Sequence, residues 1–138
     1  MVLNDSEFEN WLSHQVPLQA ATSRALRTAL LHGAPDLTES VNSDRWLNGY
    51  LFYTAGLGTM VYALGAVGRQ SVAFHAMPWY GSPELRARYR AAMEPYIAGK
   101  SCFHFSDPDN LPFAAVDGII AATGTFVAMV NVMASRRK

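Results

Sequence analysis

Two histidines and the single cysteine are the residue types in this sequence that best suit metal chemistry. His75 lies in one predicted strand, and Cys102 and His104 lie in another. If the phenylalanines that alternate with them face the core, these three side chains share the opposite face of their strands. Imidazole and thiolate groups that meet across neighbouring strands suit zinc or iron. We predict a metal site at His75, Cys102 and His104; ordinary structural histidines are the alternative.

A second group of side chains predicts a pocket for a small anionic molecule. His75, Trp79 and Tyr80 supply an apolar wall, and Ser82 stands where a helix begins. The positive end of that helix and the nearby Lys100 would attract an anion. The alternative is that the aromatic rings belong to the core and that the serine only caps the helix.

Motifs for catalysis are absent from the sequence. It contains no nucleophile elbow, P-loop, dinucleotide fingerprint or metalloprotease helix. Cys102 and His104 share a strand face without an assured hydrogen bond, so a buried, inert thiol explains the cysteine better than a nucleophile does. We predict no catalytic residue, and the sequence favours a binding protein over an enzyme.

Helices are predicted at both ends of the chain and in its middle. Ser6 with Glu9 has the spacing of a capping box, and Pro17 begins a second helix that runs to about His32. The run from Ser82 to Glu84 combines an N-cap, a proline and an acid, so it begins a middle helix. An apolar helix is expected over residues 112–134, with Gly124 as a possible helix breaker inside it.

The central part of the chain has the pattern of strands between glycine-rich turns. The expected strands are Val41–Trp46, Tyr50–Tyr53, Thr59–Val67, Gln70–Met77 and Ser101–Phe105. The expected turns are Asn48-Gly49, Gly56 to Gly58, and Gly68-Arg69. Short turns join antiparallel neighbours. We therefore predict one α+β domain over residues 1–138: an antiparallel sheet of about four to five strands, with the N-terminal helix pair, the middle helix and the C-terminal helix packed on it.

The apolar C-terminal stretch has two interpretations, a transmembrane helix and a core or dimer helix. No charged residue lies between Asp117 and Arg136, and the stretch is close to the length of a transmembrane helix. Asn131 and several threonines and glycines favour a core or dimer helix instead.

Several residues distributed along the chain carry a resemblance to a known family. They are Ala34-Pro35-Asp36-Leu37, Glu39, Trp46, Phe74-His75, Gly81, Gly99-Lys100-Ser101, Phe103 and Phe105. With this pattern, residues 18–122 resemble the YdhG-like bacterial domain family. The resemblance implies an intracellular α+β fold in a family whose members mostly have no assigned activity, some being described as frataxin-like iron chaperones. Leu47 and Asn48 follow Trp46, where a glycine and a proline are usual in the family. The acidic surface is also modest, so the iron-chaperone function of the frataxin-like members transfers poorly to this chain.

The composition of the chain indicates which partners and which cellular compartment to expect. The 138 residues include 11 acidic and 11 basic side chains, so the formal net charge is zero. Without a net positive charge the protein has no long-range attraction for nucleic acid. One cysteine and an amino terminus without a signal pattern predict the cytoplasm. We expect non-enzymatic binding of a small ligand or metal, by a homodimer that binds neither nucleic acid nor membrane. The alternative is a homo-oligomeric interaction module that buries Tyr50, Tyr53, Tyr62 and Val127 between subunits.

Overall fold

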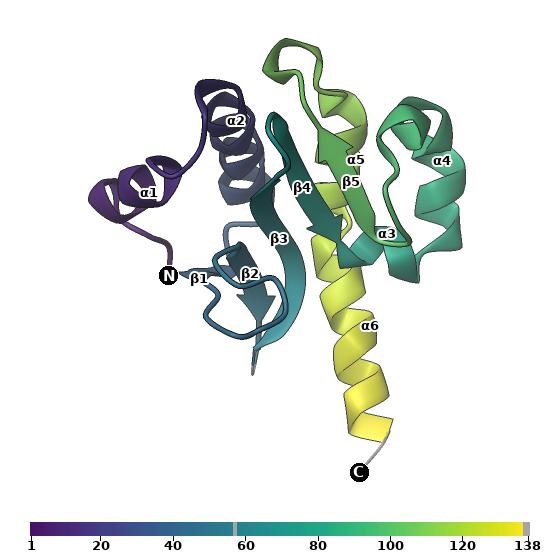
Figure 1. Cartoon of the computed structure of the whole chain (residues 1–138). Coiled ribbons are helices and arrows are strands. Elements are labelled where there is room, and N and C mark those ends of the chain that lie inside the picture. Colours follow the sequence, from purple (N-terminus) through teal and green to yellow (C-terminus); the bar gives the residue numbers. More distant parts are fainter. Residues whose placement is uncertain (57, 137–138) are drawn as a thin grey trace.

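An antiparallel sheet forms the centre of the protein (Figure 1), seen in a computed structural model that describes residues 1–56 and 58–136. Its five strands follow the order β1-β2-β3-β4-β5. They are β1 (Thr38–Val41), β2 (Leu51–Ala55), β3 (Thr59–Val67), β4 (Ser71–Ala76) and β5 (Cys102–Phe105). Each strand pairs antiparallel with the next one along the chain. The predicted α+β class and antiparallel sheet are confirmed.

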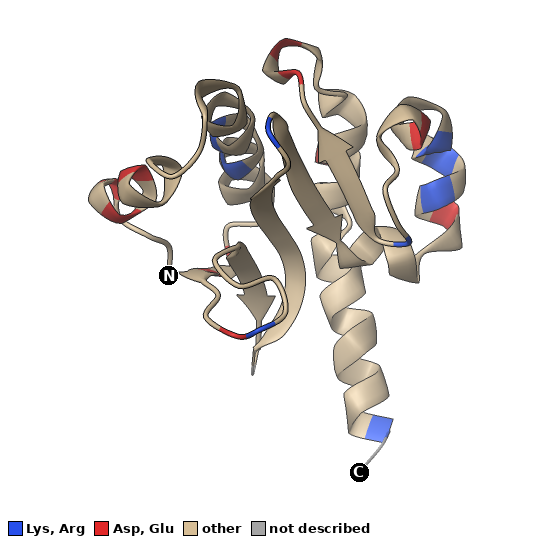
Figure 2. Cartoon of the chain, viewed as in Figure 1, with Lys and Arg blue, Asp and Glu red and all other residues tan. Residues whose placement is uncertain are grey.

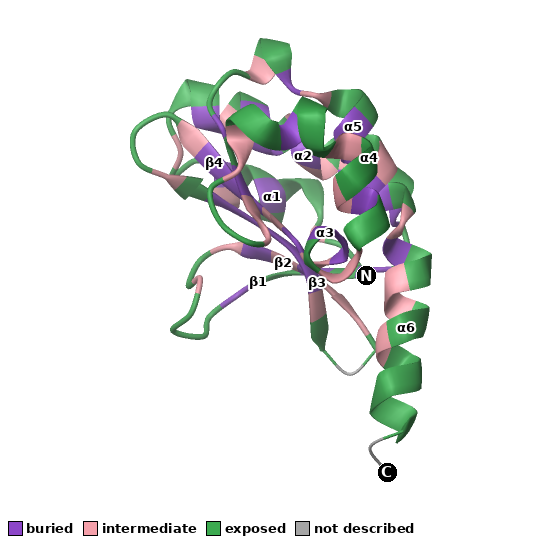
Figure 3. Cartoon of the chain, turned by 90° about the vertical axis from the view of Figure 1, so that its right-hand side faces the viewer, coloured by how far each residue is buried: buried purple, intermediate pink, exposed green. Residues whose placement is uncertain are grey.

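Helices cover one face of this sheet. They are α1 (Asp5–Leu12), α2 (Pro17–Gly33), α3 (Met77–Gly81), α4 (Pro83–Met93), α5 (Phe113–Ala121) and α6 (Thr123–Arg136), with 3-10 turns at Glu94–Tyr96 and Pro108–Asn110. In Figure 3 the helices α2 and α5 lie on one side of the strands, while the β1–β2 loop lies on the other. The sheet therefore has a packed face and an open face.

Alternation along the strands explains the packed face. Phe74 lies opposite Phe103 in the β4–β5 ladder, and Val72 lies opposite Phe105. All four side chains are fully buried. The ring of Phe74 also stacks on that of Tyr62, with 5.7 Å between their centroids. The predicted core positions of the phenylalanines are confirmed, which places the residues between them on the open face.

Local signals set the beginnings of two helices as expected. Pro17 is the first residue of α2, and Pro83 is the first residue of α4. The Ser82 hydroxyl accepts a hydrogen bond from the Leu85 backbone N–H at 3.1 Å, as an N-cap does.

The capping box predicted at Ser6 and Glu9 is wrong. Asn4 is the N-cap of α1, and it exchanges hydrogen bonds of 2.8 and 3.0 Å with Glu7. Glu9 instead forms an exposed ion pair with Arg24 of α2, at 2.7 Å. Two overlapping pairs, Asn4 with Glu7 and Ser6 with Glu9, have the capping-box spacing here, and the helix begins at the earlier one.

The first strand also begins and ends earlier than expected. The prediction of a strand over Val41–Trp46 is wrong, because β1 is Thr38–Val41 and the chain from Asn42 to Tyr50 forms a loop. Asn42 is buried in that loop, and its side-chain amide donates to the carbonyl oxygens of Trp46 and Leu47 at 2.7 and 3.1 Å. These bonds hold the loop in a turn that a strand would not permit.

The apolar tail is divided into two helices. α5 ends at Ala121 and α6 begins at Thr123, so the break falls just before Gly124. The hydroxyl of Thr123 lies 2.6 Å from that of Tyr62, which joins the break to the sheet. The stretch Phe113–Arg136 has the length and composition to cross a membrane, with a mean hydropathy of 1.8, although 28% of its most apolar window is buried in the protein.

One expectation concerns a residue beyond those described. The turn predicted at Gly56 to Gly58 includes Leu57. Leu57, Arg137 and Lys138 lie outside the described residues.

Candidate functional site

The predicted metal ligands meet on the open face of the sheet. His75 in β4 lies directly opposite Cys102 in β5, and His104 lies opposite Ala73, two residues further along the ladder. The strands are therefore neighbours, as the prediction required. Within residues 1–56 and 58–136, however, no three histidine, cysteine or acidic residues lie where they could hold one metal ion. The three-residue metal site is not formed by this geometry.

Aromatic rings surround His75 instead of further ligands. The centroid of the imidazole lies 6.1 Å from that of Tyr50 and 6.2 Å from that of Trp46. Burial, together with the neighbouring His104, lowers the pKa of His75. The neutral form of the imidazole is therefore favoured, and the ring lies among aromatic neighbours.

Cys102 is a poor nucleophile in this setting. Burial raises the pKa of its thiol to about 11, because the thiolate is disfavoured away from water. We expect its reaction with Ellman's reagent at pH 7.5 to be at least about a hundred-fold slower in the folded protein than in urea, since the thiolate is the reacting form. Equal rates in the two conditions would contradict this assignment.

The predicted anion pocket is present in part. Trp79, Tyr80 and Lys100 line one hollow of about 510 Å³, between α3, α4 and the segment that leads into β5. We call it the basic hollow; its other lining residues are Arg86, Arg90, Ile97 and Gly99. His75 is not among the lining residues, because it lies on the open face of the sheet. Ser82 is also outside the lining, and its hydroxyl is used as the cap of α4.

The two aromatic residues of the basic hollow have different roles. Trp79 is only 2% exposed and packs edge-on against Phe103, with 5.1 Å between the ring centroids. It is a core residue whose edge reaches the hollow, as the alternative interpretation held. Tyr80 is 53% exposed, so its ring is accessible to a ligand.

Arg86 is the most precisely positioned cation of the basic hollow. Its Nη1 donates hydrogen bonds to the carbonyl oxygens of Trp79 at 2.8 Å and Tyr80 at 2.6 Å. These carbonyls belong to α3, so the guanidinium also closes the end of that short helix. Its Nε and Nη2 make no hydrogen bond to any other residue in the described part of the chain. They form the planar edge that recognises a carboxylate or phosphate in a bidentate manner.

Positive charge dominates this hollow. Arg90 forms an exposed ion pair with Glu94 at 2.9 Å, and Lys100 makes no ion pair within the described ranges. Figure 2 shows the basic residues along α4, with a further one at the turn into β5. The lining residues include three cations and no acid. An anion would therefore be favoured over a cation here.

Arg86 and Arg90 line the basic hollow but were not predicted as ligand residues, although their spacing in the sequence indicates a shared helix face. The three arginines Arg86, Arg88 and Arg90 together spread around the helix and form no single basic stripe. Residues four apart share a helix face, however, so Arg86 and Arg90 lie together while Arg88 points elsewhere. Nothing in the local pattern showed that Lys100 would meet this face.

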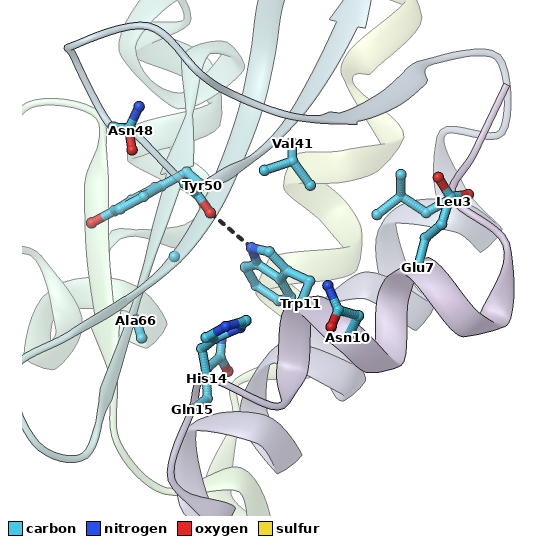
Figure 4. Close-up of a pocket in the computed structure, with 12 residues that line it drawn as sticks. Leu3, Glu7, Asn10, Trp11, His14, Gln15, Val41, Asn48, Tyr50 and Ala66 are labelled. Carbon is cyan, nitrogen blue, oxygen red and sulfur yellow. Dashed lines mark hydrogen bonds between the residues drawn. The ribbon is translucent and has the colours of Figure 1, made fainter.

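A groove of about 560 Å³ lies between α1 and the sheet (Figure 4). Some of its polar groups hold α1 in place. The indole Nε1 of Trp11 donates to the Gly49 carbonyl oxygen at 2.7 Å, and the side-chain oxygen of Gln15 accepts from the Ser23 hydroxyl at 2.8 Å. The indole of Trp11 and the side-chain oxygen of Gln15 therefore already have partners within the chain.

The fold and the basic hollow define an α+β protein with a preformed, cation-lined cavity beside an antiparallel sheet. No family model, curated protein or solved structure matches the chain. The resemblance to the YdhG-like family therefore stays a prediction from the sequence.

Proposed function

We propose that this protein binds a small anionic molecule, carrying a phosphate or carboxylate group, in the basic hollow. The observation that carries this proposal is the fixed guanidinium of Arg86, which has its Nε–Nη2 edge free while Nη1 is held by two carbonyl oxygens. Such an edge is already ordered before a ligand arrives, so little conformational entropy is lost on binding. Lys100 and Arg90 add charge at the same hollow.

The size and lining of the hollow support a small organic ligand. Its volume of about 510 Å³ lies within the range of small-molecule pockets. The exposed ring of Tyr80 offers an apolar surface beside the cations, which suits a ligand with an anionic group on a planar or apolar body. The lining residues include no carboxylate, histidine, serine or cysteine. These features support binding without catalysis, in the cytoplasmic setting that we propose from the sequence.

Lys100→Met tests this proposal without disturbing the core, because Lys100 is exposed and forms no ion pair among the described residues. We expect isothermal titration calorimetry at constant ionic strength to show binding of pyrophosphate or citrate to the unchanged protein. The variant should bind roughly ten-fold more weakly, since a hydrogen bond to a charged group is lost. Arg86→Lys keeps the charge but loses the planar edge, and it should weaken binding by a similar factor.

Arg88→Met is the matched control for these variants. It removes one exposed cation from the same region but does not line the hollow. Its affinity for the probes should equal that of the unchanged protein. The proposal fails if phosphate, pyrophosphate and citrate all give no binding heat, or if Arg88→Met weakens binding as much as Lys100→Met does.

A further inference from the structure

The groove between α1 and the sheet differs in charge from the basic hollow. Among the described residues its lining includes no lysine or arginine, and its one acid is Glu7. The Glu7 carboxylate accepts the Asn4 backbone N–H at 3.0 Å, at the N-terminal end of α1, where the positive end of the helix offsets its charge. The groove therefore attracts neither anions nor cations strongly, and we expect its ligand to be neutral.

Two aromatic rings of the groove are held in place before a ligand arrives. The indole of Trp11 donates to the Gly49 carbonyl oxygen at 2.7 Å and stacks on Phe8, with 6.0 Å between the ring centroids. The ring of Tyr50 lies against the backbone of β3, because a Cβ on Gly65 would overlap three of its atoms. Both rings line the groove, so each offers a flat apolar face at a fixed position.

Polar groups with unused hydrogen-bonding capacity lie beside these rings. The Asn10 amide and the His14 imidazole make no hydrogen bond to another residue in the described part of the chain, and both line the groove. Gln15 uses its side-chain oxygen on the Ser23 hydroxyl, which leaves its Nε2 as a donor. In Figure 4 the side chains of Asn10, Trp11 and His14 leave α1 on the side of the groove. One helix face thus supplies both aromatic and polar contacts.

We propose that this groove binds a neutral sugar of one or two pyranose units. A pyranose ring has a C–H face that packs on the negative face of an aromatic ring such as that of Trp11 or Tyr50. Its rim carries hydroxyls that both donate and accept, as the Asn10 amide does. The volume of about 560 Å³ lies within the range of small-molecule sites.

Other ligand classes match this lining less well. A purely apolar ligand would cover the Asn10 amide and the His14 imidazole without giving them partners, which costs free energy. An anion would find none of the cations that line the basic hollow. Because neutral hydrogen bonds add little each once water is displaced, we expect a dissociation constant of roughly 0.1–10 mM for the sugar.

NMR titration tests this proposal, because the indole N–H signal of Trp11 reports on the groove itself. The probes are glucose, N-acetylglucosamine, cellobiose, maltose and lactose, each added to about 50 mM, above the expected dissociation constant. At least one of them should shift the Trp11 signal and leave that of Trp79 unchanged. Asn10→Ala removes an exposed amide and should weaken this binding roughly ten-fold, since two hydrogen bonds are lost. Asn131→Ala is the matched control: it removes an exposed amide from α6, outside the groove, and should bind as the unchanged protein does.

Three outcomes would overturn the inference. The first is a Trp11 signal that none of these sugars shifts. The second is an equal affinity of Asn10→Ala and Asn131→Ala for the sugar that binds. The third is Asn10-dependent binding of adenosine at least ten-fold tighter than that of any of these sugars, which would assign the groove to nucleosides. Lys100→Met should leave sugar binding unchanged, so this proposal and that of anion binding in the basic hollow can each fail alone.

Discussion

Arg27→Met is expected to lower the free energy of unfolding by about 3–5 kcal/mol, because it leaves a buried carboxylate without its counter-charge. Glu39 of β1 has a fully buried side chain, and the guanidinium of Arg27 donates to its two oxygens at 2.8 Å each. The Tyr53 hydroxyl at 2.5 Å and the Leu3 backbone N–H at 2.9 Å complete the set of donors. Urea unfolding followed by circular dichroism measures the loss.

An exposed ion pair on the same helix provides the control. Arg24 contacts Glu9 at 2.7 Å, but the side chains are 55% and 56% exposed. Exposed pairs contribute at most about 1 kcal/mol, so Arg24→Met should change stability little. The double variant Arg27→Met/Glu39→Gln should recover part of the loss, since the buried charge is removed together with its partner. Similar losses for Arg24→Met and Arg27→Met would contradict the assignment.

The Glu39 carboxylate also makes the stability of the protein depend on pH. Burial raises the pKa of Glu39, but the hydrogen bonds from Arg27, Tyr53 and Leu3 lower it by more, so the net pKa lies below the usual value for glutamate. A lowered folded-state pKa contributes stability above the unfolded-state value of about 4.3. That contribution is lost as the pH falls from there through the folded-state pKa. Glu39→Gln should therefore lose less stability than the unchanged protein between pH 5 and pH 3.

The buried network around Glu39 could not be predicted from the sequence. Glu39 looks like a surface residue in the sequence, and nothing near it predicts a buried ion pair. Its partners Arg27, Tyr53 and Leu3 come from three other segments, so only the tertiary fold brings them together. The strands whose neighbours are joined by short turns were predicted well, because their pairing is decided locally.

The oligomer alternative was partly wrong for a related reason. It placed Tyr53 and Tyr62 between subunits, yet these side chains are 1% and 0% exposed in the core of a single chain. Both hydroxyls have internal partners, Glu39 for Tyr53 and Thr123 for Tyr62. A tyrosine with a buried partner cannot be distinguished by pattern from one at an interface.

The sequence predicted only part of the candidate site. Strand alternation placed His75 and Cys102 on one face, and the structure confirms that they are opposite each other. Three of the five predicted ligand residues, Trp79, Tyr80 and Lys100, line the basic hollow. Local pattern could not show that α4 turns its Arg86 face toward them, because that depends on how α4 packs.

Gly65→Ala is expected to cost about 1–3 kcal/mol of stability, because the open face has no room for a methyl group at this position. Gly65 lies in β3 beneath the ring of Tyr50, and a Cβ there would fall within 3.0 Å of three ring atoms, which real Cβ atoms essentially never show. One of these atoms is Cγ, at the base of the ring, so rotating the ring alone cannot relieve the clash. Tyr50 also packs near His75 at 6.1 Å, which restricts its movement.

A double-mutant cycle isolates this contact. If the Tyr50 ring causes the loss, Tyr50→Ala/Gly65→Ala should be about as stable as Tyr50→Ala alone, and the coupling should be 0.5–3 kcal/mol. Gly124→Ala is the control of opposite sign: a Cβ there meets nothing within 4 Å, and alanine replaces glycine in a helix with a gain of about 0.5–1 kcal/mol. An additive cycle would show that Gly65 is needed for its backbone alone. A coupled cycle would show that the glycine fixes Tyr50 over the sheet, and with it the ring that packs beside His75.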